Sequence, residues 1–466
     1  MGSHLILRAV GFVGGLCGLA IFAISAPPPN VIVFVADDLG WDDSGPYGNP
    51  SVKTPTMDRL AADGLVFDRA LLTTSSCSPS RCSILTGRYP HNTGAPELHQ
   101  PLPADQVLVS TFLRHAGYYT AAVGKWHLGE AAKVQFDRVW EKSGPSGAEN
   151  WVEALQDRPR DRPFFFWLAS YDPHRGYEPN TIPQPHRPAA VIVPPYLPDT
   201  PEVRADLALY YDEISRFDHY VGLACAELEA QGVLDNTFII VISDNGRPFP
   251  RAKTRLLDSG IRTPFIVCWP AGLRRVGART SQLVSVIDIA PTLVDLAGLA
   301  PESSFQGTSF AATLHDASAH VRDYAFAEHN WHDYQARERS VSDSRYTYIR
   351  NSRPDLPATP PADAVGSPTF RAMQRLERAG ELSPAMRDAF IAPRATEELY
   401  DNLADPHSLH DLIADPAHAA ALHRVRAALD QWIRDTDDQF YDDITPDHWH
   451  REHGTRLNPG RRPAGY

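Results

Sequence analysis

Five short apolar runs divide this chain, and most of them end in charged or amide side chains. Their residues are almost continuously apolar and do not alternate with polar ones, which is typical of strands buried on both faces of a layered α/β fold. A strongly apolar sheet of this kind needs helices on both of its faces. The runs are VIVFVADD at 31–38, YYTAAVGKWH at 118–127, FFFWLASYDPH at 164–174, FIIVISDNG at 238–246 and FIVCW at 265–269.

Helical patterns lie between these runs. The clearest begins at Thr200-Pro201, with Thr as the N-cap and Pro at the first helical position, and we expect it to stop at Gly232. A terminal helix is expected at about 416–434. The proline-rich stretch 173–201 and the stretch 351–368 are expected to be irregular.

The length of 466 residues suggests two or three domains. We expect a boundary near residue 335, where a large α/β region gives way to strand-like RYTYIRN and ELYDN segments. The expected units are a targeting segment over 1–26, a catalytic α/β domain over 27–335 and a smaller α+β domain over 336–466.

The N-terminus has the pattern of a secretory signal peptide. Arg8 precedes an apolar run to Ala26, small residues close the run, and three prolines follow. A retained membrane anchor is the alternative, but the run is short and glycine-rich for a bilayer span. We expect cleavage, no stable membrane association afterwards, and a periplasmic or secreted location in a bacterium, since the chain has no N-glycosylation sequon.

The charge balance excludes some classes of function. The chain has 57 acidic residues against 44 Lys and Arg, a formal charge of −13, which argues against nucleic acid as a partner. An anionic ligand must therefore be held by local groups against the overall field.

Two of the apolar runs end in oxygen ligands. Asp37 and Asp38 follow the first, and Asp244 and Asn245 follow the fourth. A single acid after a strand is usually a turn former or a helix cap. Adjacent carboxylates repel each other unless a cation lies between them, and a set made only of oxygens favours Ca²⁺ or Mg²⁺ over zinc.

Two other runs end in basic and titratable groups. Lys125 and His127 follow one, and His174 follows the other. These side chains suit the binding of an anion and the movement of protons. The alternative for any histidine is a purely structural role, which we favour for His99 and His115.

The segment TTSSCSPSRCSILTGRYPHNTG, residues 73–94, places Cys77 just before a helical pattern. Cys77 is then near a helix N-terminus, where an anion is favoured, and Arg81 lies one turn further on. As a bare cysteine, Cys77 is either a thiolate nucleophile or a buried core residue. Cys82 is expected to be packed and inert, and Cys225 and Cys268 are expected in the core.

The C-S-P-S-R motif followed by T-G-R resembles the signature of type I sulfatases. Further matches follow in the same order: ADD, GKWH, DPH, SDNG and LYDNLADP at 399–406. The resemblance runs from about Asn30 to Pro416 and implies the alkaline-phosphatase-like sulfatase fold, with a large mixed sheet flanked by helices and a smaller C-terminal α+β domain. Segments similar to the heparan N-sulfatase (sulfamidase) branch are VPPYLPDTPEVRADLALYY at 193–211, SDNGRPFP at 243–250, SPTF at 367–370 and LHQ at 98–100.

The resemblance implies that a maturation enzyme oxidises Cys77 to formylglycine. Its hydrate, a gem-diol, would attack sulfur through one hydroxyl, and it would also contact a Ca²⁺, with Mg²⁺ as the alternative ion. The same resemblance makes Asp37, Asp38, Asp244 and Asn245 the other metal ligands.

The remaining roles also follow from the resemblance. Arg81 and Lys125 would stabilise the diol and the developing charge. His127 would take the proton from the second hydroxyl as sulfate is expelled, and His174 would protonate the leaving group. Lys253 would take the place of a basic sulfate-binding residue, with Arg251 as a near competitor.

The expected activity is hydrolysis of sulfate from a sulfated glycan, with N-sulfoglucosamine as the favoured substrate. One alternative is a carbohydrate O-sulfatase with the same chemistry and a different leaving group. Two others are a phosphate or phosphonate monoester hydrolase and a catalytically inactive glycan-binding protein. The sequence makes no prediction of oligomeric state.

Overall fold

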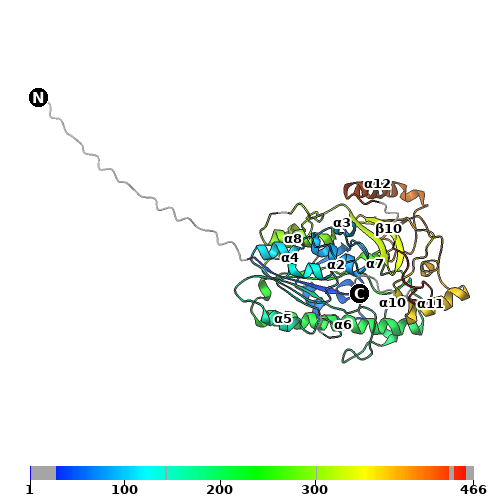
Figure 1. The fold of residues 1–466 in the computed structure, drawn as a ribbon, viewed down its shortest axis with the longest axis horizontal. Helices are drawn as coiled ribbons and strands as arrows, with labels where there is room; N and C mark the ends of the chain where they lie inside the picture. The colour runs from blue at the N-terminus through cyan, green and yellow to red at the C-terminus, as the bar shows by residue number, and fades with distance from the viewer. Residues whose placement is uncertain (2–27, 142–143, 301, 440–444, 458–466) are drawn as a thin grey trace.

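The chain folds into two β-sheets with helices packed around them (Figure 1). A computed structural model describes residues 1, 28–141, 144–300, 302–439 and 445–457. The expected signal peptide, apart from residue 1, lies outside these residues and stays a prediction. Within the part of the chain that the structure describes, no helix combines the length and apolar character needed to cross a membrane.

The larger sheet has eight strands in the order β4-β3-β5-β1-β6-β7-β2-β8. All neighbouring pairs are parallel except those made by β7, which runs antiparallel to β6 and to β2. The predicted mixed sheet is therefore confirmed. The strands are β1 (Asn30–Ala36), β2 (Leu65–Leu71), β3 (Tyr119–Gly124), β4 (Arg138–Trp140), β5 (Phe164–Ala169), β6 (Thr237–Ser243), β7 (Ile266–Cys268) and β8 (Ala278–Ser285).

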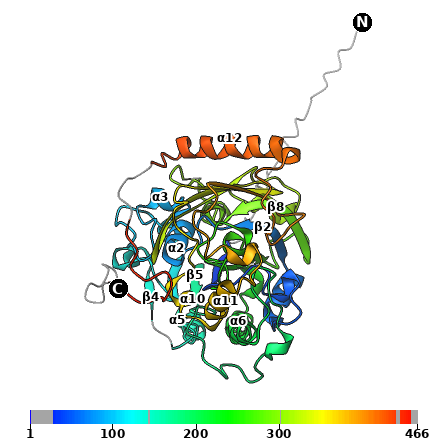
Figure 2. The same cartoon turned by 90° about the vertical axis from the view of Figure 1, so that its right-hand side faces the viewer.

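Both faces of this sheet are buried, as the continuous apolar runs predict. Along β1, the odd-numbered residues from Val31 to Val35 join one core and the even-numbered residues from Ile32 to Ala36 join the other. The first core contains α2 (Cys77–Thr86), α4 (Val109–His115), α8 (Ile289–Leu296) and α9 (Ala311–His315). The second contains α1 (Pro55–Ala62), α5 (Trp151–Asp157) and α6 (Pro201–Ala230), and Figure 2 shows α6 end-on beneath the sheet.

Helix α6 begins where the sequence predicts. The Thr200 hydroxyl accepts a hydrogen bond from the Val203 N–H, and Pro201 occupies the first position. The helix ends at Ala230, two residues before the expected stop at Gly232. The helix has 30 residues, and its Tyr210 hydroxyl lies 3.1 Å from the Asp38 carbonyl, which places the helix beside the site.

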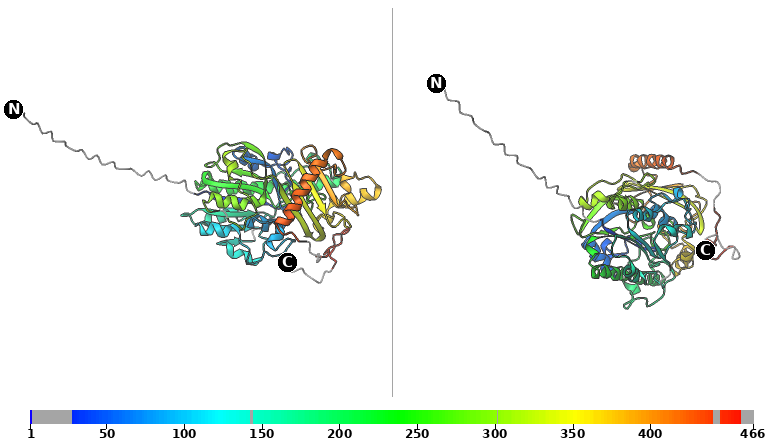
Figure 3. Two further views of the ribbon diagram at one scale, coloured as in Figure 1. Left: turned by 90° about the horizontal axis from the view of Figure 1, so that it is seen from above. Right: turned by 60° about the vertical axis from the view of Figure 1, so that its left-hand side comes forward.

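The second sheet has four antiparallel strands in the order β12-β11-β10-β9. Helix α12 (Ala419–Asp435) lies across it, as seen from above in Figure 3, close to the range expected for the terminal helix. Since β9 and β10 form one hairpin on either side of residue 333, we propose that the smaller domain starts just before β9, at Ala325 and not at 336. The strands are β9 (Ala325–His332), β10 (Tyr334–Ser342), β11 (Tyr346–Asn351) and β12 (Glu397–Asp401).

The two stretches expected to be irregular differ in outcome. Residues 173–199 contain one 3₁₀ turn, Pro188–Ala190, and otherwise no helix or strand. The prediction for 351–368 is wrong over the short helix α10 (Ala362–Val365), which is followed by α11 (Pro368–Ala379). The Asp333 carboxylate accepts a hydrogen bond of 2.9 Å from the Ala362 N–H, a tether from a distant residue that local sequence does not reveal. The described residues also form the short α-helices α3 (Pro90–Thr93) and α7 (Asp258–Ile261).

Candidate active site

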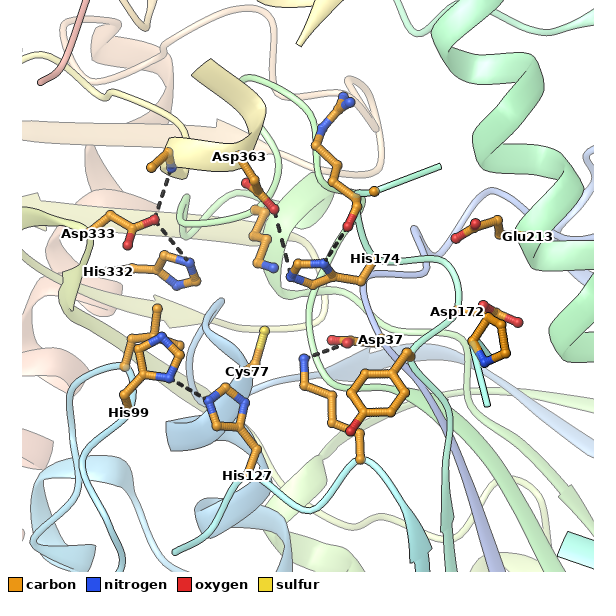
Figure 4. A pocket seen from close by; sticks show the side chains of 18 of the residues that line it. Asp37, Cys77, His99, His127, Asp172, His174, Glu213, His332, Asp333 and Asp363 are labelled. Atoms are coloured by element: carbon orange, nitrogen blue, oxygen red, sulfur yellow. Dashed lines mark hydrogen bonds and ion pairs between the residues drawn. The ribbon is translucent and has the colours of Figure 1, made fainter. Parts of the chain in front are cut away.

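Polar residues from four parallel strands meet at one edge of the large sheet. Strands β1, β3, β5 and β6 are neighbours and run parallel, so their carboxyl ends lie together. A cavity of about 1020 Å³ opens at this edge. Figure 4 shows Cys77 near its centre, with residues from both sheets around it.

The acidic residues after β1 and β6 form one buried cluster. Single ligand atoms of Asp37, Asp38, Cys77 and Asp244 all lie within 4.8 Å of one another. The Asp38 N–H donates to Asp244 at 3.2 Å, and the Asn245 amide hydrogen-bonds Asp38. Asp38 itself has a φ of 80°, a left-handed conformation that is uncommon outside glycine.

This cluster suits a hard cation. The three carboxylates are fully buried, and like charges at this separation disfavour one another. Asp37 Oδ1 and Asn245 Oδ1 are buried without a hydrogen-bond partner among the described residues. Buried oxygens of this kind are the ligands that Ca²⁺ and Mg²⁺ prefer, so the residues present fit a divalent ion.

Three cationic side chains surround the carboxylates. Arg81 donates to Asp244 at 2.8 Å and to the Lys125 carbonyl at 3.0 Å. Lys125 pairs with Asp37, and Lys253 pairs with Asp38 at 2.7 Å. Burial favours the neutral form of each amine, but these carboxylates outweigh it and raise the pKa of both lysines.

The local backbone explains how Lys125 reaches the cluster. Gly124 has a φ of 97°, and a Cβ there would lie 1.9 Å from the Ala169 carbonyl, so only glycine can end β3 this close to β5.

Arg251, the competitor of Lys253, donates to the carbonyls of His407 and Ser408. Of the two competing basic residues, the structure therefore brings Lys253 and not Arg251 to the cluster.

Cys77 is the first residue of α2, as predicted, and Arg81 lies one turn further on the same face. The thiol is 3.9 Å from an Asp38 oxygen, and the residue is 2% exposed. Burial raises the pKa of Cys77, more than Lys125 and Lys253 lower it. A thiol in this state is a poor thiolate nucleophile.

The other described cysteines are packed as expected. Cys82, a residue of α2, is fully buried in the core on that face of the sheet, and Cys225 and Cys268 lie in the core on the opposite face.

His127 lies beside Cys77 and pairs with a second histidine. Its Nε2 is 2.7 Å from the Nδ1 of His99, and Figure 4 shows the two rings together at the cavity wall. Burial, with Lys125 nearby, lowers the pKa of both and brings that of His99 to about 4, so both rings are neutral at neutral pH. The sequence favours a structural role for both His99 and His115. His99 instead lines the cavity, whereas His115 lies exposed on α4.

His174 lies on the loop after β5 and faces the cavity from the opposite side. Its Nε2 is 3.9 Å from Asp38 and 3.7 Å from Asp363, and its Nδ1 is 3.0 Å from the Arg175 carbonyl. The neighbouring Asp172 is held by Arg216 at 2.5 Å. This ion pair fixes the start of the loop that carries His174.

The comparisons with known proteins agree with this geometry. A family model described as Sulfatase matches residues 29–148 and 146–299, and one described as N-sulphoglucosamine sulphohydrolase, C-terminal, matches 252–354. Human N-sulphoglucosamine sulphohydrolase is 32% identical, with 89% of this chain and 92% of that protein covered. The chain belongs to the sulfatase family. It is accordingly a hydrolase of sulfate esters or sulfamates.

Two further comparisons place this sulfatase among its relatives. An ulvan-active sulfatase of Formosa agariphila is 30% identical over 87% of this chain and 74% of that protein. A solved structure of a protein in complex with its substrate D-glucosamine-2-N,6-O-disulfate superposes with a TM-score of 0.70 at 20% identity, over 88% of this chain and 99% of that one. The latter likeness confirms the predicted fold.

Several residues at the sulfatase cavity were not singled out from the sequence. His332 and Asp333 come from the end of β9, and Asp363 comes from α10. The Ser76 hydroxyl at the start of α2 is 2.8 Å from His332 Nδ1, which joins the smaller domain to the site. His99, His127 and Asp333 share a positive φ, a strain that gathers at functional sites but that no sequence pattern here reveals.

Proposed function

We propose that this sulfatase removes sulfate from N-sulfoglucosamine at a non-reducing end. The observation that carries the proposal is the position of Cys77, first in α2, between a buried acidic cluster and three cationic side chains. The identity with human N-sulphoglucosamine sulphohydrolase, and the match to that enzyme's C-terminal model, support the sulfamate over other sulfated sugars.

The site would hold one Ca²⁺, with Mg²⁺ as the alternative, through Asp37, Asp38, Asp244, Asn245 and residue 77. The three carboxylates and the three cations around them carry no net formal charge together. A divalent ion would make the site positive, and it would supply a Lewis acid for the sulfate oxygens. The monoanionic sulfate group of the substrate is then attracted despite the overall charge of −13.

Residue 77 would act as formylglycine, made from Cys77 by a separate maturation enzyme. Its hydrate supplies an oxygen nucleophile that the buried thiol cannot replace. Arg81 and Lys125 interact electrostatically with residue 77 and would hold the negative charge that develops on it, while Lys253 would bind a sulfate oxygen. All three are buried in fixed ion pairs, so they need little reorganisation during the reaction.

The histidines would move the protons. His127, neutral and next to residue 77, would accept a proton at Nδ1, the nitrogen that His99 does not engage, as sulfate is released. His174, across the cavity, would donate a proton from Nε2 to the leaving nitrogen. The overall reaction consumes one water and gives sulfate and the free amine of the sugar.

A carbohydrate O-sulfatase is the second candidate. The similarity to an ulvan-active sulfatase favours it, and the sulfate-binding groups would be the same. Only the wall of the cavity would distinguish the two leaving groups.

The N-terminal pattern supports export. We infer a signal peptide over 1–26 that directs the enzyme to the periplasm or outside a bacterial cell, where it would meet a sulfated glycan. Its partners would be that glycan and, during synthesis, the maturation enzyme.

The test is kcat/KM for sulfate release from N-sulfoglucosamine and, in parallel, from 6-O-sulfated N-acetylglucosamine. We expect a clear preference for the sulfamate. A preference for the 6-O-sulfate would keep the sulfatase and remove the sulfamidase proposal.

A further inference from the structure

The walls of the cavity differ in charge. The floor around Cys77 carries Arg81, Lys125 and Lys253, which suit a sulfate group. Figure 4 shows two carboxylates on the wall that faces this floor: Asp363 lies beside the His174 ring, and Asp333 lies beside His332. Carboxylates in the cavity would repel the same sulfate, so anion binding alone does not explain their presence.

Asp363 is the acid closest to the proposed proton donor. Its Oδ2 lies 3.7 Å from His174 Nε2, while its Oδ1 accepts a hydrogen bond of 2.6 Å from the Ala364 N–H. The side chain is 32% exposed and lines the cavity. Burial would raise the pKa of Asp363, but Lys253 and His174 outweigh it and keep the carboxylate ionised.

The backbone next to Asp363 is held by a hydrogen bond to Asp333. Asp333 accepts the Ala362 N–H at 2.9 Å and lies 3.9 Å from His332. Helix α10 is therefore attached to the end of β9, and the position of Asp363 relative to His174 does not depend on its own short helix alone.

The two candidate substrates differ at the bridging atom, which the proposed donor His174 would protonate. A sulfamate has a bridging N–H, which donates a hydrogen bond. A sulfate ester has a bridging oxygen, which carries lone pairs and no hydrogen. An ionised carboxylate accepts from the first and repels the second.

We propose that Asp363 is a specificity-determining residue that accepts a hydrogen bond from the bridging N–H of a sulfamate and disfavours the bridging oxygen of a sulfate ester. This inference rests on the proposed function, because it assumes that the leaving group occupies the space between His174 and Asp363. The acid selects by attraction to one substrate and by repulsion of the other, so its effect appears in the ratio of the two rates.

The experiment compares N-sulfoglucosamine with glucose 2-O-sulfate, which differ only in NH against O at the bridge. For the active enzyme and for Asp363→Asn, kcat and KM are measured on both substrates. We expect the wild type to prefer the sulfamate and Asp363→Asn to lower that preference about 10–100-fold, because the amide can donate to an ester oxygen. Glu178→Gln removes an exposed acid that lines the same cavity and forms no ion pair with His174 among the described residues, and it should change both rates by the same factor.

The outcomes separate the two proposals. An equal loss on both substrates, or no change in the ratio, would overturn the role of Asp363 and leave the sulfamidase proposal intact. A wild type that releases no sulfate from N-sulfoglucosamine but cleaves O-sulfated sugars overturns both. If thermal unfolding shows Asp363→Asn to be misfolded, Asp363→Ser removes the same charge with a hydroxyl that can still accept the Ala364 N–H, and the same ratio decides.

Discussion

The Nδ1 of His99 and the Nε2 of His127 lie 2.7 Å apart, so one imidazole donates a hydrogen bond to the other. Burial keeps both rings neutral, and His99 occupies Nε2 of His127, so Nδ1, which has no hydrogen-bond partner among the described residues, is the nitrogen left to take a proton. His99 thus positions the residue that we propose as the base.

We expect His127→Ala to lower kcat/KM by about 10²–10⁴-fold, the usual contribution of a general base. His99→Ala should cost less, about 10–100-fold, the range seen when a partner that orients a ligand or base is removed. His99→Gln should recover part of the activity, since its amide can both donate and accept. A His99→Ala enzyme as active as the wild type would contradict the positioning role.

Modification of Cys77 is the second prediction. In an active preparation, mass spectrometry of the tryptic peptide that contains Cys77 should show an aldehyde in place of the thiol. Cys77→Ala should abolish turnover and leave the thermal unfolding transition in place. Cys82→Ala, five residues further along the same helix, should keep its activity, and full activity with an entirely unmodified Cys77 thiol would refute the proposal.

The proposed cation gives the third prediction. Exhaustive chelation should abolish sulfate release, and Ca²⁺ or Mg²⁺ should restore it. Asp244→Asn should reduce both bound metal and activity, whereas Asp161→Asn, an exposed acid, should change neither. Elemental analysis that finds only zinc, or activity that survives chelation, would show that the cluster does not hold a hard cation.

The sequence predicts the residues of this site that follow the buried strands, because their meeting at one edge does not depend on the order of the strands in the sheet. Asp37, Lys125, His174 and Asp244 each follow a buried apolar run, and parallel strands bring their carboxyl ends to one edge whatever their order in the sheet. The motif resemblance supplied the fold, and the helix pattern placed Cys77 at the start of α2.

The remaining parts depend on contacts between distant segments. Asp363 reaches the cavity because Asp333, 30 residues earlier, holds the N–H of Ala362. His99 contributes through a left-handed backbone and a contact with His127, neither of which has a sequence signature. The expected boundary near residue 335 falls inside the hairpin of β9 and β10, because local composition does not show that these two strands pair.

The proton donor provides the fourth prediction, which depends on the leaving group. His174→Ala should lose about 10²–10⁴-fold on N-sulfoglucosamine, because an amine leaves only when its nitrogen is protonated. On 4-nitrophenyl sulfate the loss should be much smaller, because nitrophenolate leaves without a proton. Equal losses on both substrates would instead indicate that His174 binds the sulfate group.

A buried ion pair away from the cavity joins strand β9 to helix α3 and gives the last prediction. Glu328 on β9 accepts hydrogen bonds from the backbone and the side chain of His91 at 2.8 and 2.9 Å, and Arg339 lies 3.5 Å away. Burial alone would raise the pKa of Glu328, but His91 and Arg339 hold it at about 2, and Glu328 in turn raises the pKa of His91.

The two groups set a pH window for stability. The Glu328 pKa falls from 4.5 unfolded to about 2 folded, which corresponds to about 3 kcal/mol of stability that is complete above pH 4.5 and is lost as the pH falls towards 2. The raised pKa of His91 adds stability that is complete below its unfolded value of 6.5 and is lost as the pH rises through the folded value. We therefore expect Glu328→Gln to lower the free energy of unfolding most between about pH 4.5 and 6.5. Urea unfolding of the wild type and of Glu328→Gln at pH 3, 5.5 and 8 checks this. Glu381→Gln, at an exposed position, is the control, and its free energy of unfolding should stay within about 0.5 kcal/mol of the wild type. If Glu328→Gln lowers the free energy of unfolding equally at all three pH values, the pair contributes through packing and not through charge.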